Sequence, residues 1–167
     1  MSRYRVGVLL YFRSVKGQLL LIKRKRAPNA GLWCAVGGKL EMETGESPVE
    51  CARREAFEEI GIELKDSDLL LRAMLSEKDY EETGHWLMFV YEIKKRLSSI
   101  PSSIDEGRFN FFNIGDLHKL EMPWLDKLIL TDKLLDPDGE EFHAIHVSCQ
   151  EASDAGVVIV EESIGRR

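Results

Sequence analysis

The 167-residue chain is poor in cysteine, with only Cys34, Cys51 and Cys149. Their number is odd and no two of them have the C-x-x-C spacing, which argues against both a disulfide framework and a zinc site. A reducing compartment suits such a chain, so we expect it in the cytoplasm.

Basic residues are also scarce: 23 Lys and Arg stand against 29 Asp and Glu, for a formal net charge of −6. Duplex nucleic acid needs a broad basic face on its partner, so we expect no nucleic acid polymer as a ligand. A small phosphate-bearing ligand is still compatible with this charge, because a bound divalent cation reverses the local field. The apolar run in the opening MSRYRVGVLLYFRS is too short to cross a membrane, and we expect no membrane association.

A hydrophobic fraction of 44% and a charged fraction of 31% are typical of a soluble globular protein. The length suits one domain, and we expect residues 1–167 to form it, as a monomer or a homodimer. Apolar runs of strand length alternate with helical patterns, which predicts an α/β fold with one mixed sheet. Strands are expected at 4–12, 18–23, 69–74, 85–93 and 108–112, and helical segments at 114–120 and from Pro123 to about Leu135. A turn signal at Asp136–Gly139 and apolar runs at 141–147 and 156–161 predict a C-terminal β-hairpin extension within 140–162.

One helix is predicted with both of its ends. Ser47 suits the N-cap, Pro48 the first helical position, and Glu50 lies three residues after Ser47, which completes a capping box. Gly61 provides a C-terminal stop, so the helix spans roughly 13 residues.

The same helix gathers negative charge on one face. Glu55, Glu58 and Glu59 lie three and four residues apart, within about one helical turn. Such a patch could be a solvated surface, but like charges at this spacing repel, and a purely structural helix usually interleaves lysines. A hard divalent cation that takes oxygen ligands explains the cluster directly. The preceding Gly37 and Gly38 allow the backbone to approach an ion or a phosphate closely.

These residues resemble the signature of the Nudix hydrolase family. The matching part is Glu46, seven residues, and then Arg54-Glu55-Ala56-Phe57-Glu58-Glu59-Ile60-Gly61-Ile62. Seven residues (KLEMETG) separate Gly38 from Glu46, where the family usually has five. The resemblance implies an α/β/α sandwich and hydrolysis of a nucleoside diphosphate linked to another group.

The resemblance also implies roles for the signature residues. Glu55 and Glu59 would bind Mg²⁺, or alternatively Mn²⁺, with Glu58 completing the cluster and activating water. Gly37 would offer its carbonyl to the metal, and Arg54 would orient the glutamates. Arg24 and Lys39 are the best candidates for contacts with phosphate, although either could instead be a solvated surface charge.

Segments outside the signature resemble the branch that degrades oxidised purine nucleoside triphosphates such as 8-oxo-dGTP. By that resemblance Glu106 would be a further metal ligand or base, although it could instead be a charged residue of a loop. Asp126 would contact the purine edge, although it could instead be an exposed helix residue. Four aromatic residues could belong to the core, with one or two of them stacking on a base: Trp33, Phe111, Trp124 and Phe142. Of these, Trp124 is predicted to contact the substrate. Cys34 stands where the branch has an asparagine, which removes an amide from the base-binding edge.

Two functions of different classes follow. The first is a metal-dependent pyrophosphohydrolase that converts an (oxidised) purine nucleoside triphosphate to monophosphate and pyrophosphate, with ADP-ribose or a dinucleotide as alternative substrates. The second is a nucleotide-sensing module of the same fold without catalysis. The complete glutamate cluster favours the enzyme.

Overall fold

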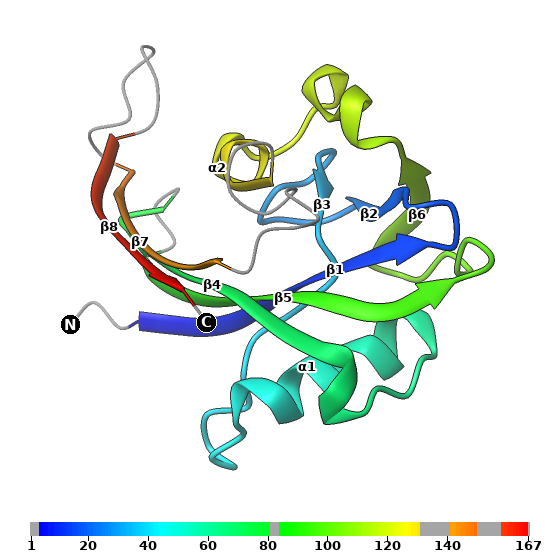
Figure 1. Ribbon diagram of the computed structural model, residues 1–167, viewed down its shortest axis with the longest axis horizontal. Coiled ribbons are helices and arrows are strands. Elements are labelled where there is room, and N and C mark those ends of the chain that lie inside the picture. The colour runs from blue at the N-terminus through cyan, green and yellow to red at the C-terminus, as the bar shows by residue number, and fades with distance from the viewer. Residues whose placement is uncertain (1–3, 81–83, 131–140, 150–157, 167) are drawn as a thin grey trace.

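The computed structural model describes residues 4–80, 84–130, 141–149 and 158–166 (Figure 1). Its strands are β1 (Tyr4–Ser14), β2 (Leu19–Arg24), β3 (Trp33–Cys34), β4 (Leu69–Lys78), β5 (His85–Leu97), β6 (Gly107–Phe112), β7 (Glu141–Ser148) and β8 (Val158–Arg166). Its helices are α1 (Pro48–Ile60) and α2 (Trp124–Ile129), with 3₁₀ turns η1 (Asp66–Asp68) and η2 (Ile114–Lys119). In these residues no helix is long and apolar enough to cross a membrane.

The strands form one mixed sheet in the order β3-β2-β1-β5-β4-β7-β8, with β6 paired to β2. The pairs β1–β5 and β4–β7 are parallel, whereas β1–β2, β2–β3, β2–β6, β4–β5 and β7–β8 are antiparallel. The predicted mixed sheet is therefore confirmed.

Both faces of the sheet are covered, as Figure 1 shows, with α1 on one face and α2 on the other. Along β1 the side chains alternate between two cores: Val8, Leu10 and Phe12 pack with α1, whereas Leu9 and Tyr11 pack on the opposite side. That opposite core includes buried side chains of η2 and α2. The arrangement confirms the expected α/β/α sandwich.

Several elements differ in extent from the expectation. Strands β4 and β5 each run four residues further, to Lys78 and Leu97, and the predicted helix at 114–120 is a 3₁₀ helix. The helix that follows Pro123 ends at Ile129, and residues 131–135 of the predicted segment lie outside the described residues. Strand β8 ends later than the expected 161, because its pairing with β7 continues to Arg166, and residues 156 and 157 of the predicted run lie outside the described residues. Pairing of β7 with β4 also makes the hairpin part of the main sheet.

Helix α1 has the predicted caps. Ser47 accepts a hydrogen bond from the Glu50 backbone N–H at 3.2 Å, and the Glu50 carboxylate accepts one from the Ser47 N–H at 2.8 Å. Gly61 ends the helix with φ of 70°, a left-handed conformation that suits glycine. These caps fix which residues of α1 face the sheet.

Replacing Ser47 with alanine should lower the free energy of unfolding by about 1 kcal/mol, because the first turn of α1 loses its side-chain cap. Urea denaturation measures the change. Ser103→Ala, in the exposed loop before β6, is the matched control and should leave stability unchanged. Equal stability of the two variants would show that the capping box contributes nothing.

Candidate functional site

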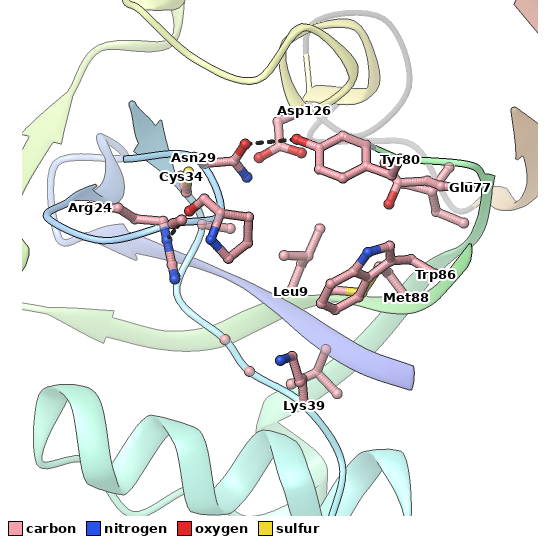
Figure 2. A pocket seen from close by; sticks show the side chains of 17 residues that line it. Leu9, Arg24, Asn29, Cys34, Lys39, Glu77, Tyr80, Trp86, Met88 and Asp126 are labelled. Atoms are coloured by element: carbon pink, nitrogen blue, oxygen red, sulfur yellow. Dashed lines mark hydrogen bonds between the residues drawn. The ribbon is translucent and has the colours of Figure 1, made fainter. Parts of the chain in front are cut away.

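A cleft with a volume of about 240 Å³ opens on the face of the sheet that carries α2. Figure 2 shows its side chains converging from β1, the 24–39 segment, the β4–β5 region and α2. The lining residues are Val8, Leu9, Arg24, Ala27, Pro28, Asn29, Cys34, Ala35, Gly37, Gly38, Lys39, Leu75, Glu77, Tyr80, Trp86, Met88 and Asp126.

The glycine pair forms the part of the cleft wall nearest α1. The Leu10 and Val8 N–H groups donate to the carbonyls of Val36 and Gly38 at 2.7 and 2.9 Å, which fastens this segment to β1. Gly37 has φ of 148°, and a Cβ there would lie 2.1 Å from the Val8 carbonyl oxygen. Only glycine fits at this position, and its N–H is directed toward α1.

Glu59 is the acceptor for this N–H group: the Gly37 amide donates to the Glu59 carboxylate at 3.2 Å. Burial raises the pKa of Glu59 to about 7, and the charges of Glu55 and Glu106 act in the same direction. The Gly37 hydrogen bond and the charge of Arg24 oppose this rise without overcoming it. Glu59 is thus a partly buried carboxyl group whose ionised form would be stabilised by additional positive charge.

Glu55 lies beside Glu59 on the inner side of α1. Its side chain is only 12% exposed, and burial raises its pKa above the ordinary value. A Cβ added to Gly38 would lie 2.1 Å from Glu55 Oε1, so this carboxylate packs directly against the glycine backbone. The second glycine is therefore required for the approach of α1.

Arg54 joins the carboxylates to the preceding loop. Its Nε and Nη2 donate to the two oxygens of Glu46 at 2.8 and 3.0 Å, and its Nη1 donates to Glu55 and Glu58 at 2.8 and 3.1 Å. Nη2 also donates to the Lys39 carbonyl oxygen at 3.0 Å. The Arg54 hydrogen bonds hold the pKa of Glu46 below its ordinary value. One guanidinium thereby fixes three carboxylates and a backbone carbonyl.

The long loop before Glu46 does not displace it. Backbone hydrogen bonds from Thr44 and Glu46 to the Glu41 carbonyl oxygen, at 3.1 and 3.3 Å, close the loop into a compact turn. The Glu41 N–H then donates to Glu46 Oε2 at 2.7 Å. The two residues beyond the family spacing are accommodated while Glu46 still reaches Arg54.

The donor set suits a hard divalent cation. The partly buried carboxylates of Glu55 and Glu59 lie against a glycine backbone, and oxygen ligands of this kind are those that Mg²⁺ and Mn²⁺ take. In the described part of the chain, no three acidic, His or Cys side chains already form a closed ligand group. The side chain of Glu58 is 56% exposed and is paired with Arg54. Glu106 is exposed, although its charge helps to raise the pKa of Glu59. Their assignment as ligands, with that of the Gly37 carbonyl, stays a prediction.

Four of the five predicted substrate contacts lie in the cleft: Arg24, Lys39, Cys34 and Asp126. Asp126 is half-buried and lines the cleft, so it does not lie on an exposed helix face, and burial raises the pKa of its carboxyl group to about 7. Trp124 is 37% exposed and is not among the lining residues, so the structure gives no contact for its predicted role. Trp33 is buried and packs edge-on against Phe112, as a core residue.

Sequence reasoning missed the aromatic and polar residues at the far side of the cleft. Trp86 and Tyr80 are buried and line it, together with Asn29 and the buried Glu77. Lys39 Nζ lies 5.6 Å from the centre of the Trp86 ring. Alternation along β5 gives Trp86 and Met88 the same face, but only the pairing of β5 with β1 brings that face to the cleft.

The sequence model of the NUDIX domain matches residues 3–134, most of the chain. The chain belongs to the Nudix family. Its glutamate helix, glycine pair and Arg54 network are thus the Nudix signature region in three dimensions.

Individual proteins are similar to part of the chain. The chain is 29% identical over 107 residues to an uncharacterized Nudix hydrolase of Bacillus subtilis and 32% identical over 103 residues to an ADP-ribose pyrophosphatase of Methanocaldococcus jannaschii. These matches cover 63% and 62% of the chain, and 64% and 59% of the two relatives, less than two thirds of their length.

Solved structures show the same fold. A MutT protein from Bacillus halodurans superimposes with a TM-score of 0.69 at 23% identity, covering 96% of this chain and 97% of its own. A MutT Nudix hydrolase from Burkholderia pseudomallei gives 0.65 at 30% identity, covering 79% and 98%.

The raised pKa of Glu59 predicts the pH dependence of stability in metal-free protein. Ionisation is harder in the folded state, so this residue destabilises the fold as pH rises from about 4.5 to 7. Glu59→Gln should therefore melt at a higher temperature than wild type at pH 8 and at the same temperature at pH 4, measured calorimetrically with EDTA. Glu63→Gln, at an exposed position, is the control and should change neither value. A lower melting temperature of Glu59→Gln at pH 8 would contradict the assignment.

Proposed function

We propose that this Nudix protein is a divalent-metal-dependent pyrophosphohydrolase acting on a nucleoside diphosphate linked to another group. The favoured substrate is an (oxidised) purine nucleoside triphosphate, cleaved to the monophosphate and pyrophosphate, and a reducing cytoplasm is the proposed setting. The observation that carries this proposal is the pair of partly buried carboxylates, Glu55 and Glu59, against the glycine wall of a cleft that also presents Arg24 and Lys39.

Glu55 and Glu59 would hold Mg²⁺ or Mn²⁺, with the Gly37 carbonyl, Glu58 and Glu106 as the further proposed ligands. When bound, the cation neutralises the diphosphate and lowers the pKa of a coordinated water. Val36 and Gly38 direct their carbonyls at β1, and the Gly37 N–H donates to Glu59, which supports the proposal that the backbone of Gly37 lies beside the cation.

The remaining residues would bind and orient the substrate. Arg24 Nε donates to the Pro28 carbonyl oxygen at 2.9 Å, which holds the side chain in place, and the charge of Arg24 acts to lower the pKa of Glu59. With Lys39 it provides positive charge for phosphate oxygens at the α1 end of the cleft. During hydrolysis a water oxygen bonds to phosphorus, the bond from phosphorus to the bridging oxygen breaks, and a glutamate of the cluster accepts the proton.

ADP-ribose is the second candidate substrate, because a relative 32% identical over 103 residues is an ADP-ribose pyrophosphatase. A dinucleotide would present the same diphosphate. A nucleotide sensor without catalysis would not require the complete glutamate set, in which Arg54 joins Glu46, Glu55 and Glu58 while Glu59 accepts from the Gly37 N–H.

Hydrolysis should be measured with Mg²⁺ on a panel of dGTP, 8-oxo-dGTP, dATP, ADP-ribose and a dinucleoside polyphosphate. We expect turnover of a purine triphosphate with pyrophosphate as product, and a loss of at least 100-fold in kcat for Glu59→Gln, because removing a metal ligand weakens metal binding and water activation.

Glu63→Gln, on the exposed surface after α1, is the matched control and should retain wild-type kcat. Absence of hydrolysis of every diphosphate would refute the enzyme, whereas preference for ADP-ribose over all triphosphates would replace the favoured substrate by the second candidate. Full activity of Glu59→Gln would refute its role as a ligand.

A further inference from the structure

The backbone of Lys39 is fastened from two sides, at the end of the cleft nearest α1. On the side of β1, the N–H of the next residue, Leu40, donates to the Val6 carbonyl oxygen at 3.0 Å. On the side of α1, Arg54 Nη2 donates to the carbonyl oxygen of Lys39 itself at 3.0 Å. The Lys39 side chain therefore starts from a fixed point beside the glycine pair.

Gly7 leaves room for that side chain to pass over β1. Lys39 lies opposite Gly7 in an antiparallel bridge, and Gly7 lies beside Met88 on the other edge of β1, where β5 is paired. A Cβ at Gly7 would lie 2.7 Å from the Gly38 carbonyl oxygen and 3.2 Å from the end of the Met88 side chain. Because no side chain stands at this position, Lys39 can cross β1 and reach β5.

Trp86 is the residue of β5 that the Lys39 side chain reaches. Lys39 Nζ lies 5.6 Å from the centre of the indole ring, which is within the range of a cation–π interaction. Arg5, the partner of Trp86 in the register of β1 with β5, has its guanidinium carbon 5.4 Å from the centre of the same ring. The buried indole is thus an uncharged platform that two cations share.

The same ring lies between Lys39 and a carboxylate. Glu77 of β4 is the partner of Trp86 in the register of β4 with β5, and it is buried and lines the cleft. Figure 2 shows Trp86 between Glu77 and Lys39. Lys39 forms no ion pair with any residue that the structure describes. Because the indole holds the ammonium without neutralising it, the positive charge stays available to an anion.

We propose that Trp86 is a positioning residue: its indole holds the Lys39 ammonium at the glycine end of the cleft, where the ammonium contacts a phosphate oxygen of the substrate. A lysine side chain is long and flexible, so holding it in place before the substrate arrives lowers the entropic cost of the contact. Trp86 also keeps the ammonium away from Glu77, which would otherwise compete with the phosphate for it.

This inference rests on the proposed function and deepens it, because it says how the cleft holds the phosphate groups. The base of the nucleotide plays no part in it. A probe that consists of phosphate groups alone can therefore test it.

The probe is inorganic pyrophosphate, and isothermal titration calorimetry in the presence of Mg²⁺ measures its binding. Lys39→Met should bind it about tenfold more weakly than wild type, because a charge-assisted contact is lost. Trp86→Leu keeps an apolar side chain without a π face and should bind it about fivefold more weakly. Trp86→Phe keeps an aromatic ring of weaker cation affinity, so the loss should be only about twofold.

Lys23→Met is the matched control. Lys23 Nζ lies 5.8 Å from the centre of the Trp33 ring, so the contact is of the same kind, but neither residue lines the cleft. This variant loses one positive charge and one cation–π contact, as Lys39→Met does. It should bind pyrophosphate as wild type does.

A double variant separates positioning from packing. If Trp86 acts through Lys39, adding Trp86→Leu to Lys39→Met should weaken pyrophosphate binding no further, because the group that the ring positions is already gone. A ring that serves only the shape of the cleft would weaken binding by the same factor with Lys39 present or absent. Equal factors in the two backgrounds would therefore overturn the inference, as would unchanged binding in Trp86→Leu.

If Trp86→Leu does not fold, as judged by circular dichroism, Trp86→Phe takes its place in the cycle, and equal factors in the two backgrounds again overturn the inference. Absence of pyrophosphate binding by wild type, with a nucleotide still hydrolysed, would overturn the inference and leave the proposed function standing. Absence of both pyrophosphate binding and hydrolysis of every panel substrate would instead remove both.

Discussion

The site depends on the hydrogen bonds of a single guanidinium group. Arg54 is on α1, yet its partners include Glu46 and the Lys39 carbonyl, both in the loop that leads from the cleft to the helix. Through Glu55 and Glu58 it also sets side chains of its own helix. Like charges gathered on one helical turn would otherwise spread apart, and the planar fork of arginine holds them at defined positions. Lysine could not replace this geometry, because it is a point charge without the fork.

The second constraint is the distance between α1 and the sheet. Cys51, Ala52 and Ala56 are completely buried, and their small size lets the helix pack closely against β1. Glycine at positions 37 and 38 removes the side chains that would otherwise separate the helix from the strand segment. Carboxylates one turn apart therefore reach the backbone of the glycine pair. The same 13-residue helix thus forms the hydrophobic core on one side and the acidic site on the other.

Much of this could be predicted from the sequence because it depends on local spacing. The caps of α1, the shared face of Glu55 and Glu59, and the family itself follow from residues within one short segment. Trp86, Tyr80 and Asn29 could not be assigned to the cleft, because they reach it only through the parallel pairing of β1 with β5 and a hydrogen bond across 51 residues. Trp124 stays a prediction, since a motif position does not reveal which side of a short helix a residue occupies, and the residue is not among those that line the cleft. The length of β4 and β5 was underestimated, because cross-strand partners extend strands beyond their apolar runs.

The parallel pairing of β7 with β4 has a consequence for the sheet as a whole. The match to the NUDIX domain ends at residue 134, whereas β7 begins at Glu141 and lies along the β4 edge from Ala73 to Lys78. Without it, an apolar strand with unpaired N–H and carbonyl groups would be open to pairing with other chains. Among the described strands the C-terminal hairpin moves the outer edge of the sheet to β8, whose sequence places Glu161 and Glu162 in the middle of that strand. Adjacent charges on an outer strand disfavour the addition of a further strand, so the sequence of β8 suits the edge of a sheet better than that of β4 does.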